Sequence, residues 1–260
     1  MAIFKTENSD YIEINSSVGK TIRVIRKEKY ESFNESILGL GEIDTKATNV
    51  NAISVVFDLE GFTNFCKQID PQLAVPEYLS EFLKWLFQQV RKELIDETFE
   101  EGYRTYTNLP FLSKFMGDGI LFLWDTDNLN EDEIMNIVLS MYEICTAYRE
   151  EFHPLISKHI ISPPMTLRCG IARGAIYSVG NGNDFVGPCI NMAARLQKLN
   201  SLTFSFSRRG LNPEVNEFYS GKFVTKKVDI RGIGNDELVC VLKSEFDNLP
   251  IPEQEKFSDV

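Results

Sequence analysis

Hydrophobic and polar positions recur with two different periods along the chain, and the change of period predicts the elements. A short apolar run rich in β-branched residues, Ala52–Asp58, predicts a buried strand. Spacings of three and four predict two amphipathic helices, one beginning near Pro76 and one at Glu131–Phe152. Two apolar runs, Phe111–Met116 and Ile120–Trp124, flank an Asp-Gly dipeptide and predict a β-hairpin.

The second half of the chain continues the alternation of strands and helices. The pattern predicts a strand pair at Met165–Ala172 and Ala175–Val179, a loop at Gly180–Asp184, a helix from about Pro188 to Leu199, and strands at Phe204–Ser207, Phe223–Ile230 and Leu238–Leu242. Because two of the pairings are hairpins, we expect a mainly antiparallel sheet with helices on one face. That arrangement is an α+β fold of ferredoxin-like type.

The termini differ from this alternating core. Residues 1–45 are mixed and charged, with weak alternation around Thr21–Ile25, and are predicted to be an N-terminal extension. Residues 46–245 would form the main domain. Residues 246–260 carry prolines and many charges, so we expect a loosely ordered C-terminal tail.

Composition narrows the class of partner. The net charge of −11 disfavours nucleic acid and anionic membranes, which attract clusters of lysine and arginine, but it leaves small phosphate-bearing substrates open. Five cysteines without a C-x-x-C pair suit reduced thiols in the cytoplasm, and two histidines are too few for a histidine-based metal site. Met1–Asp10 is polar and no apolar run approaches the length of a membrane span, so we expect a cytoplasmic protein.

Two aspartates lie at strand ends beside glycines. Asp58 closes the first predicted strand, and Asp118 lies in the turn of the hairpin. Each alone fits ordinary turn chemistry. On neighbouring strands the two could hold Mg²⁺, which accepts one or two carboxylates and takes its other ligands from phosphates and water. The turn Gly61–Thr63 after Asp58 could cradle a phosphate with its N–H groups, but taken alone the segment favours an ordinary strand-to-helix turn.

Asn191 and Arg195 lie four residues apart and so share one face of the predicted third helix. Together they could orient a ribose and neutralise charge on a transferring phosphoryl group. By spacing alone, a surface arginine in an ion pair and an asparagine pointing into water are the favoured interpretation.

Three ordered segments resemble the signature segments of class III adenylate and guanylate cyclases: Phe57–Thr63, Lys114–Asp118 and Asp184–Arg195. The resemblance spans roughly Ala52 to Leu242. It implies that Asp58 and Asp118, with the backbone carbonyl of Leu59, bind two divalent cations, Mg²⁺ or Mn²⁺. It also implies that Asn191 and Arg195 position the ribose and stabilise the transition state.

The same resemblance assigns the remaining substrate contacts. Lys114 and Asp184 match the positions that read the base, and a Lys–Asp pair there is the adenylate-cyclase choice. Gly61, Phe62 and Thr63 would bind the phosphates. Arg231 stands where the family usually places lysines near the triphosphate, although Ile233 departs from that pattern. Since the metal carboxylates and the Asn–Arg pair come from different subunits in the family, a C₂ homodimer with composite sites is implied.

Departures from the adenylate pattern point to another base. Val56 replaces a frequent phenylalanine, Phe57 fills a usually small position, and the span from Asp58 to Asp118 is long, with an aromatic insert at 102–110. A compact cyclase of this style resembles the pyrimidine cyclases of bacterial Pycsar anti-phage systems. The resemblance implies conversion of UTP, or CTP, to a cyclic monophosphate that activates a separate effector encoded nearby.

Two alternatives stay open. An adenylate cyclase making cyclic AMP fits the Lys114–Asp184 pair. A catalytically inactive cyclase-like module for nucleotide binding or dimerisation is disfavoured, because Asp58, Asp118, Asn191 and Arg195 are all present.

Overall fold

The computed structural model describes residues 5, 7–15, 21–100, 103–106, 109–215, 219 and 221–260. Contacts divide the chain into two units, Met1–Thr48 with Tyr177–Val186, and Asn49–Ile176 with Gly187–Val260. Parts of the predicted extension (1–4, 6 and 16–20) and of the aromatic insert (102, 107 and 108) lie outside the described residues. The predicted boundaries 1–45, 46–245 and 246–260 stay predictions.

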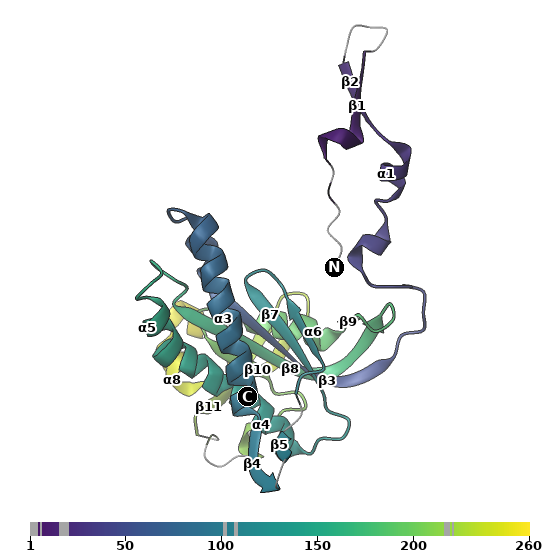
Figure 1. Cartoon of the computed structure of the whole chain (residues 1–260). Helices are drawn as coiled ribbons and strands as arrows, with labels where there is room; N and C mark the ends of the chain where they lie inside the picture. The colour runs from purple at the N-terminus through teal and green to yellow at the C-terminus, as the bar shows by residue number, and fades with distance from the viewer. Residues whose placement is uncertain are drawn as a thin grey trace. The chain divides into compact units, whose positions relative to one another are not determined.

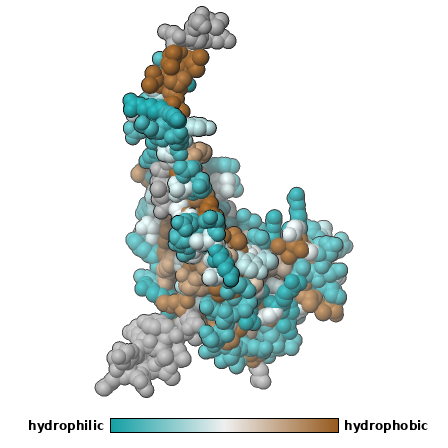
Figure 2. Space-filling view, turned by 90° about the vertical axis from the view of Figure 1, so that its right-hand side faces the viewer, coloured by the Kyte–Doolittle hydropathy of each residue, from teal (hydrophilic) through white to brown (hydrophobic). Residues whose placement is uncertain are grey.

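Among its described residues the first unit contains the short elements η1 (Asn8–Asp10), β1 (Tyr11–Asn15), β2 (Thr21–Ile25), α1 (Lys27–Glu31), η2 (Glu35–Leu38) and β9 (Asp184–Val186). Strands β1 and β2 pair antiparallel, with Ile12 opposite Val24 and Ile14 opposite Ile22. Ile12, Ile14 and Ile22 are about half exposed, and the apolar residues of this hairpin form a brown group in Figure 2. β9 pairs antiparallel with the end of β8 (Thr166–Val179). The sequence pattern did not predict β9.

The second unit is organised around one sheet, with strand order β13-β11-β12-β10-β8-β3-β7-β6 (Figure 1). Its strands, besides β8, are β3 (Asn49–Glu60), β6 (Leu112–Phe115), β7 (Gly119–Asp125), β10 (Phe204–Ser207), β11 (Phe223–Ile230), β12 (Gly234–Leu242) and β13 (Phe257–Ser258). β8 and β10 run parallel, whereas β6–β7, β3–β7, β10–β12, β11–β12 and β11–β13 are antiparallel. The predicted mainly antiparallel α+β fold is therefore confirmed. A separate antiparallel pair consists of β4 (Ile95–Glu100) and β5 (Tyr103–Tyr106).

The helices among the described residues of this unit are α2 (Phe62–Phe65), α3 (Pro71–Glu93), α4 (Glu131–Ala147), the π-helix η3 (Tyr148–Phe152), α5 (His153–Ile156), α6 (Pro188–Leu196), η4 (Pro213–Val215), α8 (Lys243–Asp247) and α9 (Ile251–Gln254). Asn130 caps α4 reciprocally with Glu133, which explains why the helix begins where its acidic run does. The predicted helix Glu131–Phe152 is present as α4 and η3.

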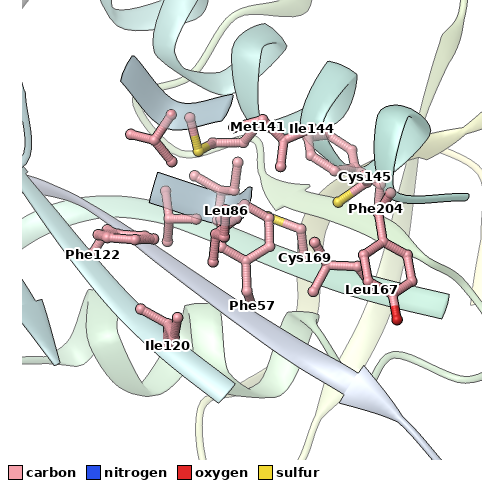
Figure 3. Close-up of a cluster of buried hydrophobic side chains, with 14 of the residues drawn as sticks. Phe57, Leu86, Ile120, Phe122, Met141, Ile144, Cys145, Leu167, Cys169 and Phe204 are labelled. Atoms are coloured by element: carbon pink, nitrogen blue, oxygen red, sulfur yellow. The ribbon is translucent and has the colours of Figure 1, made fainter. Parts of the chain in front are cut away.

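Helices α3 and α4 cover one face of the sheet and form the main core with it. Figure 3 shows Leu86 of α3 and Met141 and Ile144 of α4 beside Phe57 and Cys169 of the strands. Within this core the buried hydroxyl groups of Tyr78 and Tyr148 lie 2.7 Å apart. Tyr148 also donates to the carbonyl of Pro164 at 2.6 Å, so both phenols are satisfied without water.

Helix α6 packs on the opposite face, so the prediction that helices cover one face only is wrong. Successive residues of a strand point to opposite faces. Phe57 belongs to the α3–α4 core, whereas Ser54 contacts Cys189 of α6, with oxygen and sulfur 3.2 Å apart. The run Ala52–Leu59 is buried throughout, which is the pattern of a strand covered on both sides.

Three further expectations are corrected. α3 begins at Pro71 rather than near Pro76, which lies inside the helix and removes only one backbone hydrogen bond there. The predicted strand pair at 165–179 is the single strand β8, because Gly174 has no left-handed backbone conformation and continues the strand instead of forming a turn. The C-terminal tail is not loosely ordered: Phe257 is buried and β13 pairs with β11.

Candidate active site

Strand pairing brings Asp58 and Asp118 together. In the antiparallel pair of β3 and β7, Asp58 stands opposite Gly119, the residue after Asp118. The N–H of Leu59 donates to the carbonyl oxygen of Asp118 at 3.0 Å, which ties the end of β3 to the hairpin turn. The two carboxylates predicted to bind metal are thus neighbours in the fold.

The surroundings of Asp58 disfavour a bare negative charge. The residue is 8% exposed. Burial raises the pKa of its carboxyl, the charge of Asp118 raises it further, and Lys198 and Arg168 act in the opposite direction. The net shift is upward, so the ionised form is favoured once additional positive charge arrives.

This donor set fits Mg²⁺ or Mn²⁺. Asp58 is buried beside a second carboxylate, Asp118, and a hard divalent cation would bind both through oxygen ligands. Among the described residues no group of three or more His, Cys, Asp or Glu side chains gathers as a metal site. A two-carboxylate site of this kind would take its remaining ligands from phosphates, water and backbone, which is the arrangement that magnesium accepts. The Leu59 carbonyl stays a predicted ligand.

Helix α6 carries Asn191 and Arg195 on its exposed side. Its buried side consists of Cys189, Met192, Ala193 and Leu196. Spacing of four puts Asn191 and Arg195 on one stripe of the opposite side, and both are exposed. Within the part of the chain that the structure describes, neither side chain forms a hydrogen bond or an ion pair. Both are therefore available to a ligand or to a second subunit.

The same stripe ends at a residue that the sequence reasoning missed. Lys198 follows α6 three residues after Arg195, and its Nζ lies 3.6 Å from Oδ1 of Asp58. Ser54 contacts Cys189 at one end of this region, and Asp58 contacts Lys198 at the other. The nine-residue rise from Cys189 to Lys198 and the four-residue rise from Ser54 to Asp58 are both about 13 Å, so the two segments match in length. α6 thus runs alongside β3 towards the carboxylates. The i, i+4, i+7 spacing of Asn191, Arg195 and Lys198 was the signal that could have identified Lys198.

Gly61, Phe62 and Thr63 form the start of α2. Gly61 has φ of 83°, a left-handed conformation that suits glycine, and a Cβ there would meet open space. The N–H groups of Phe62 and Thr63, at the start of the helix, have no acceptor within it. The side chain of Phe62 packs against Phe65 and Tyr78, with ring centroids 5.8 and 6.4 Å away. Phe62 therefore anchors the turn, and its backbone is the part that could meet a phosphate.

The remaining predicted contacts stay predictions. Lys114 lies on β6 and is exposed. Asp184 begins β9 in the other unit, where its carboxylate accepts from the N–H of Phe185 at 2.9 Å. Arg231 is exposed in the turn between β11 and β12, which the N–H of Ile233 closes by donating to the carbonyl of Ile230 at 3.0 Å.

A cavity of about 620 Å³ lies beside the turn that begins at Gly61, and neither Asp58 nor Asp118 lines it. Its lining includes Glu60, Gly61, Asn64 and Gln68 on one side and His153 and Met165 on the other. It shares only the turn with the candidate site, so the chemistry is assigned to the strand ends and not to this cavity.

Among the described helices none is both long and apolar enough to cross a membrane.

Solved structures identify the fold. The chain is similar to the adenylyl cyclase CyaB from P. aeruginosa, with a TM-score of 0.57 and 14% identity over 76% of this chain and 95% of that chain. It is also similar to the guanylyl cyclase Cya2, with a TM-score of 0.56 and 17% identity over 75% of this chain and 93% of that chain. No protein-family model matches the sequence, and no curated protein matches it. The fold is thus that of nucleotide cyclase catalytic domains.

Proposed function

We propose that this protein is a class III nucleotide cyclase that converts a nucleoside triphosphate into a 3′,5′-cyclic monophosphate and pyrophosphate. The observation that carries the proposal is the placement of Asp58 and Asp118 at adjacent strand ends of a cyclase fold. A protein that kept this fold only for binding would not require the carboxylate of Asp58 at a position where burial and the charge of Asp118 raise its pKa. Such a shifted pKa is the mark of a functional site.

Each predicted residue has a distinct task in this proposal. Asp58 and Asp118, with the Leu59 carbonyl, hold two divalent cations, which supply charge stabilisation for the attacking and leaving oxygens. Asn191 orients the ribose, and Arg195 neutralises charge that develops on the α-phosphoryl group. The N–H groups at Gly61–Thr63 bind the phosphates. Lys114 and Asp184 read the base, and Arg231 contacts the triphosphate.

For the substrate we propose UTP, with CTP as a close second, and a role as second-messenger synthase in bacterial anti-phage defence. The support is the resemblance to pyrimidine cyclases and the departures at Val56 and Phe57. Phe57 packs edge-on against Phe122, with centroids 6.2 Å apart, so its ring belongs to the core. Val56 lies on the same face of β3 as Asp58 and has no aromatic ring to offer a base. The Lys114–Asp184 pair favours the second candidate, adenylate cyclase.

Product analysis tests this proposal directly. The purified protein is incubated separately with ATP, GTP, CTP and UTP plus Mn²⁺, and products are resolved by mass spectrometry. We expect cyclic UMP or cyclic CMP. Cyclic AMP as the main product would overturn the pyrimidine assignment and leave the cyclase assignment intact. No cyclic product from any of the four would contradict cyclase activity and favour the inactive module.

We also propose a C₂ homodimer with composite sites. Asn191 and Arg195 project from the exposed side of α6, whereas the residue of this segment that contacts Asp58 in the same chain is Lys198. A twofold axis would bring the exposed pair of one subunit to the carboxylates of the other.

Mixing two inactive variants tests for composite sites. Asp58→Ala and Asn191→Ala should each be inactive, but co-refolded or co-expressed they should regain about a quarter of the wild-type activity. Half of randomly assorted dimers are mixed, and one of the two sites in each mixed dimer is intact. Steady-state cyclisation at several mixing ratios measures the recovery. No recovery in mixtures that demonstrably form mixed dimers would place both halves of a site in one chain.

A further inference from the structure

The backbone at Lys198 is fixed in position, and this places the lysine side chain beside the carboxylate of Asp58. Its neighbours Gln197 and Leu199 are 4% and 8% exposed, and Leu196 is 1% exposed, so the chain at the end of α6 is anchored on both sides. The N–H of Lys198 donates to the carbonyl of Arg195 at 3.1 Å. The ammonium then reaches Asp58, whose side chain is 11% exposed, while the lysine side chain itself remains 61% exposed.

We propose that Lys198 is a resident counter-ion of the metal site: it occupies the carboxylate of Asp58 in the metal-free protein and competes with the divalent cation for it. This inference rests on the proposed function, since it takes Asp58 and Asp118 as metal ligands. The ammonium of Lys198 and a divalent cation bound to Asp58 would both lie within a few ångströms of the same carboxylate. Because these like charges repel strongly, the ammonium must leave when the dication binds. Because its side chain is mostly exposed, the lysine can swing into solvent without breaking core packing.

The reason for a counter-ion lies in the pair of carboxylates. Without metal, the neighbouring carboxylates of Asp58 and Asp118 repel each other, and the ammonium of Lys198, 3.6 Å from Oδ1 of Asp58, offsets that repulsion. The guanidinium of Arg168 is a second cation near Asp58. Arg168 is already paired with Glu60 on the neighbouring strand. Lys198 is therefore the cation whose displacement the metal requires. It keeps the empty site assembled and lowers its affinity for free cations, so that the site fills mainly together with an anionic nucleotide.

The test is a titration with Mn²⁺ in the absence of nucleotide, read by the electron paramagnetic resonance signal of free Mn²⁺. Lys198→Ala should bind Mn²⁺ more tightly than wild type, by about three- to fivefold, because an ion pair is no longer displaced. Lys198→Arg keeps the charge and should restore the wild-type Kd to within about twofold. Lys243→Ala is the matched control: its side chain is also 61% exposed and is also paired with an aspartate, Asp247, away from the site. It should leave the Kd unchanged.

The outcomes separate this inference from the proposed function. If Asp58→Ala abolishes Mn²⁺ binding but Lys198→Ala binds no more tightly than wild type, the counter-ion role is overturned and the metal site stands. If Asp58→Ala binds Mn²⁺ as well as wild type, the metal site fails, and the counter-ion role fails with it. Tighter binding by both Lys198→Ala and Lys198→Arg would assign the effect to packing and not to charge, and would also overturn the inference.

Discussion

Replacing Asp58 by asparagine is expected to lower the rate of cyclisation by at least a thousandfold while leaving the protein folded. Loss of a metal-binding carboxylate removes charge stabilisation that the transition state requires, and a thousandfold corresponds to about 4 kcal/mol. The fold should survive because the charge of Asp58 is unfavourable where it lies. Its raised pKa means that the folded state binds the proton more tightly than the unfolded state, so ionisation at neutral pH lowers stability. A neutral isostere removes that cost.

The prediction for Asp58→Asn is checked by two measurements, the cyclisation rate and the thermal midpoint of unfolding. The rate with Mn²⁺ should fall, while the thermal midpoint without metal should stay equal to that of wild type or rise. Asp125→Asn is the matched control, since Asp125 ends β7, the strand paired with β3, at the end away from Asp58. It is exposed and stands opposite Ala52 of β3. It should keep full activity. A rate for Asp58→Asn above a tenth of wild type would contradict the metal role of this carboxylate.

Replacing Gly170 by alanine is expected to destabilise the protein by about 3 kcal/mol, near the upper end of the cost of overpacking. A Cβ on Gly170 would stand 2.2 Å from the carbonyl oxygen of Ala193 and 2.3 Å from the backbone nitrogen of Gln197. Both are backbone atoms at the end of α6, so a rotamer change cannot relieve the clash. The helix itself must move away from β8, and Arg195 and Lys198 move with it.

Gly174→Ala provides the control on the same strand and the same face. There a Cβ would meet the Cβ of Cys189 at 3.5 Å, an ordinary contact. Urea unfolding should show a lower midpoint for Gly170→Ala and a change below about 1 kcal/mol for Gly174→Ala. Activity should fall in Gly170→Ala even at temperatures where it remains folded. Equal stability of the two variants would show that α6 does not pack on β8 as closely as the structure has it.

The hairpin and the helices illustrate what local pattern can predict. The Asp-Gly turn between two apolar runs specified β6 and β7, and the acidic run after Asn130 specified the start of α4. Both depend on residues within a few positions of each other, so their chemistry is readable along the chain. The strand β8 was misread as a pair because Gly174 interrupts the apolar pattern, whereas in the structure its backbone continues the strand.

The C-terminal segment 246–260 is a second case in which the local sequence did not predict the structure. Charged residues and prolines around 246–260 have the composition of a loose end, yet Phe257 finds a buried position beside β11. One strand edge with unpaired backbone groups is enough to order it. That edge exists only after the sheet has formed.

The sequence by itself determined the chemical groups of the candidate site and their order: the carboxylates Asp58 and Asp118, and the polar stripe Asn191 and Arg195. Their spacing on strands and on one helix face follows from backbone periodicity. Only the tertiary structure decided that α6 lies on the face of β3 opposite the main core, and therefore that Lys198 reaches Asp58. The choice of face depends on side-chain packing between distant segments, which no local period encodes.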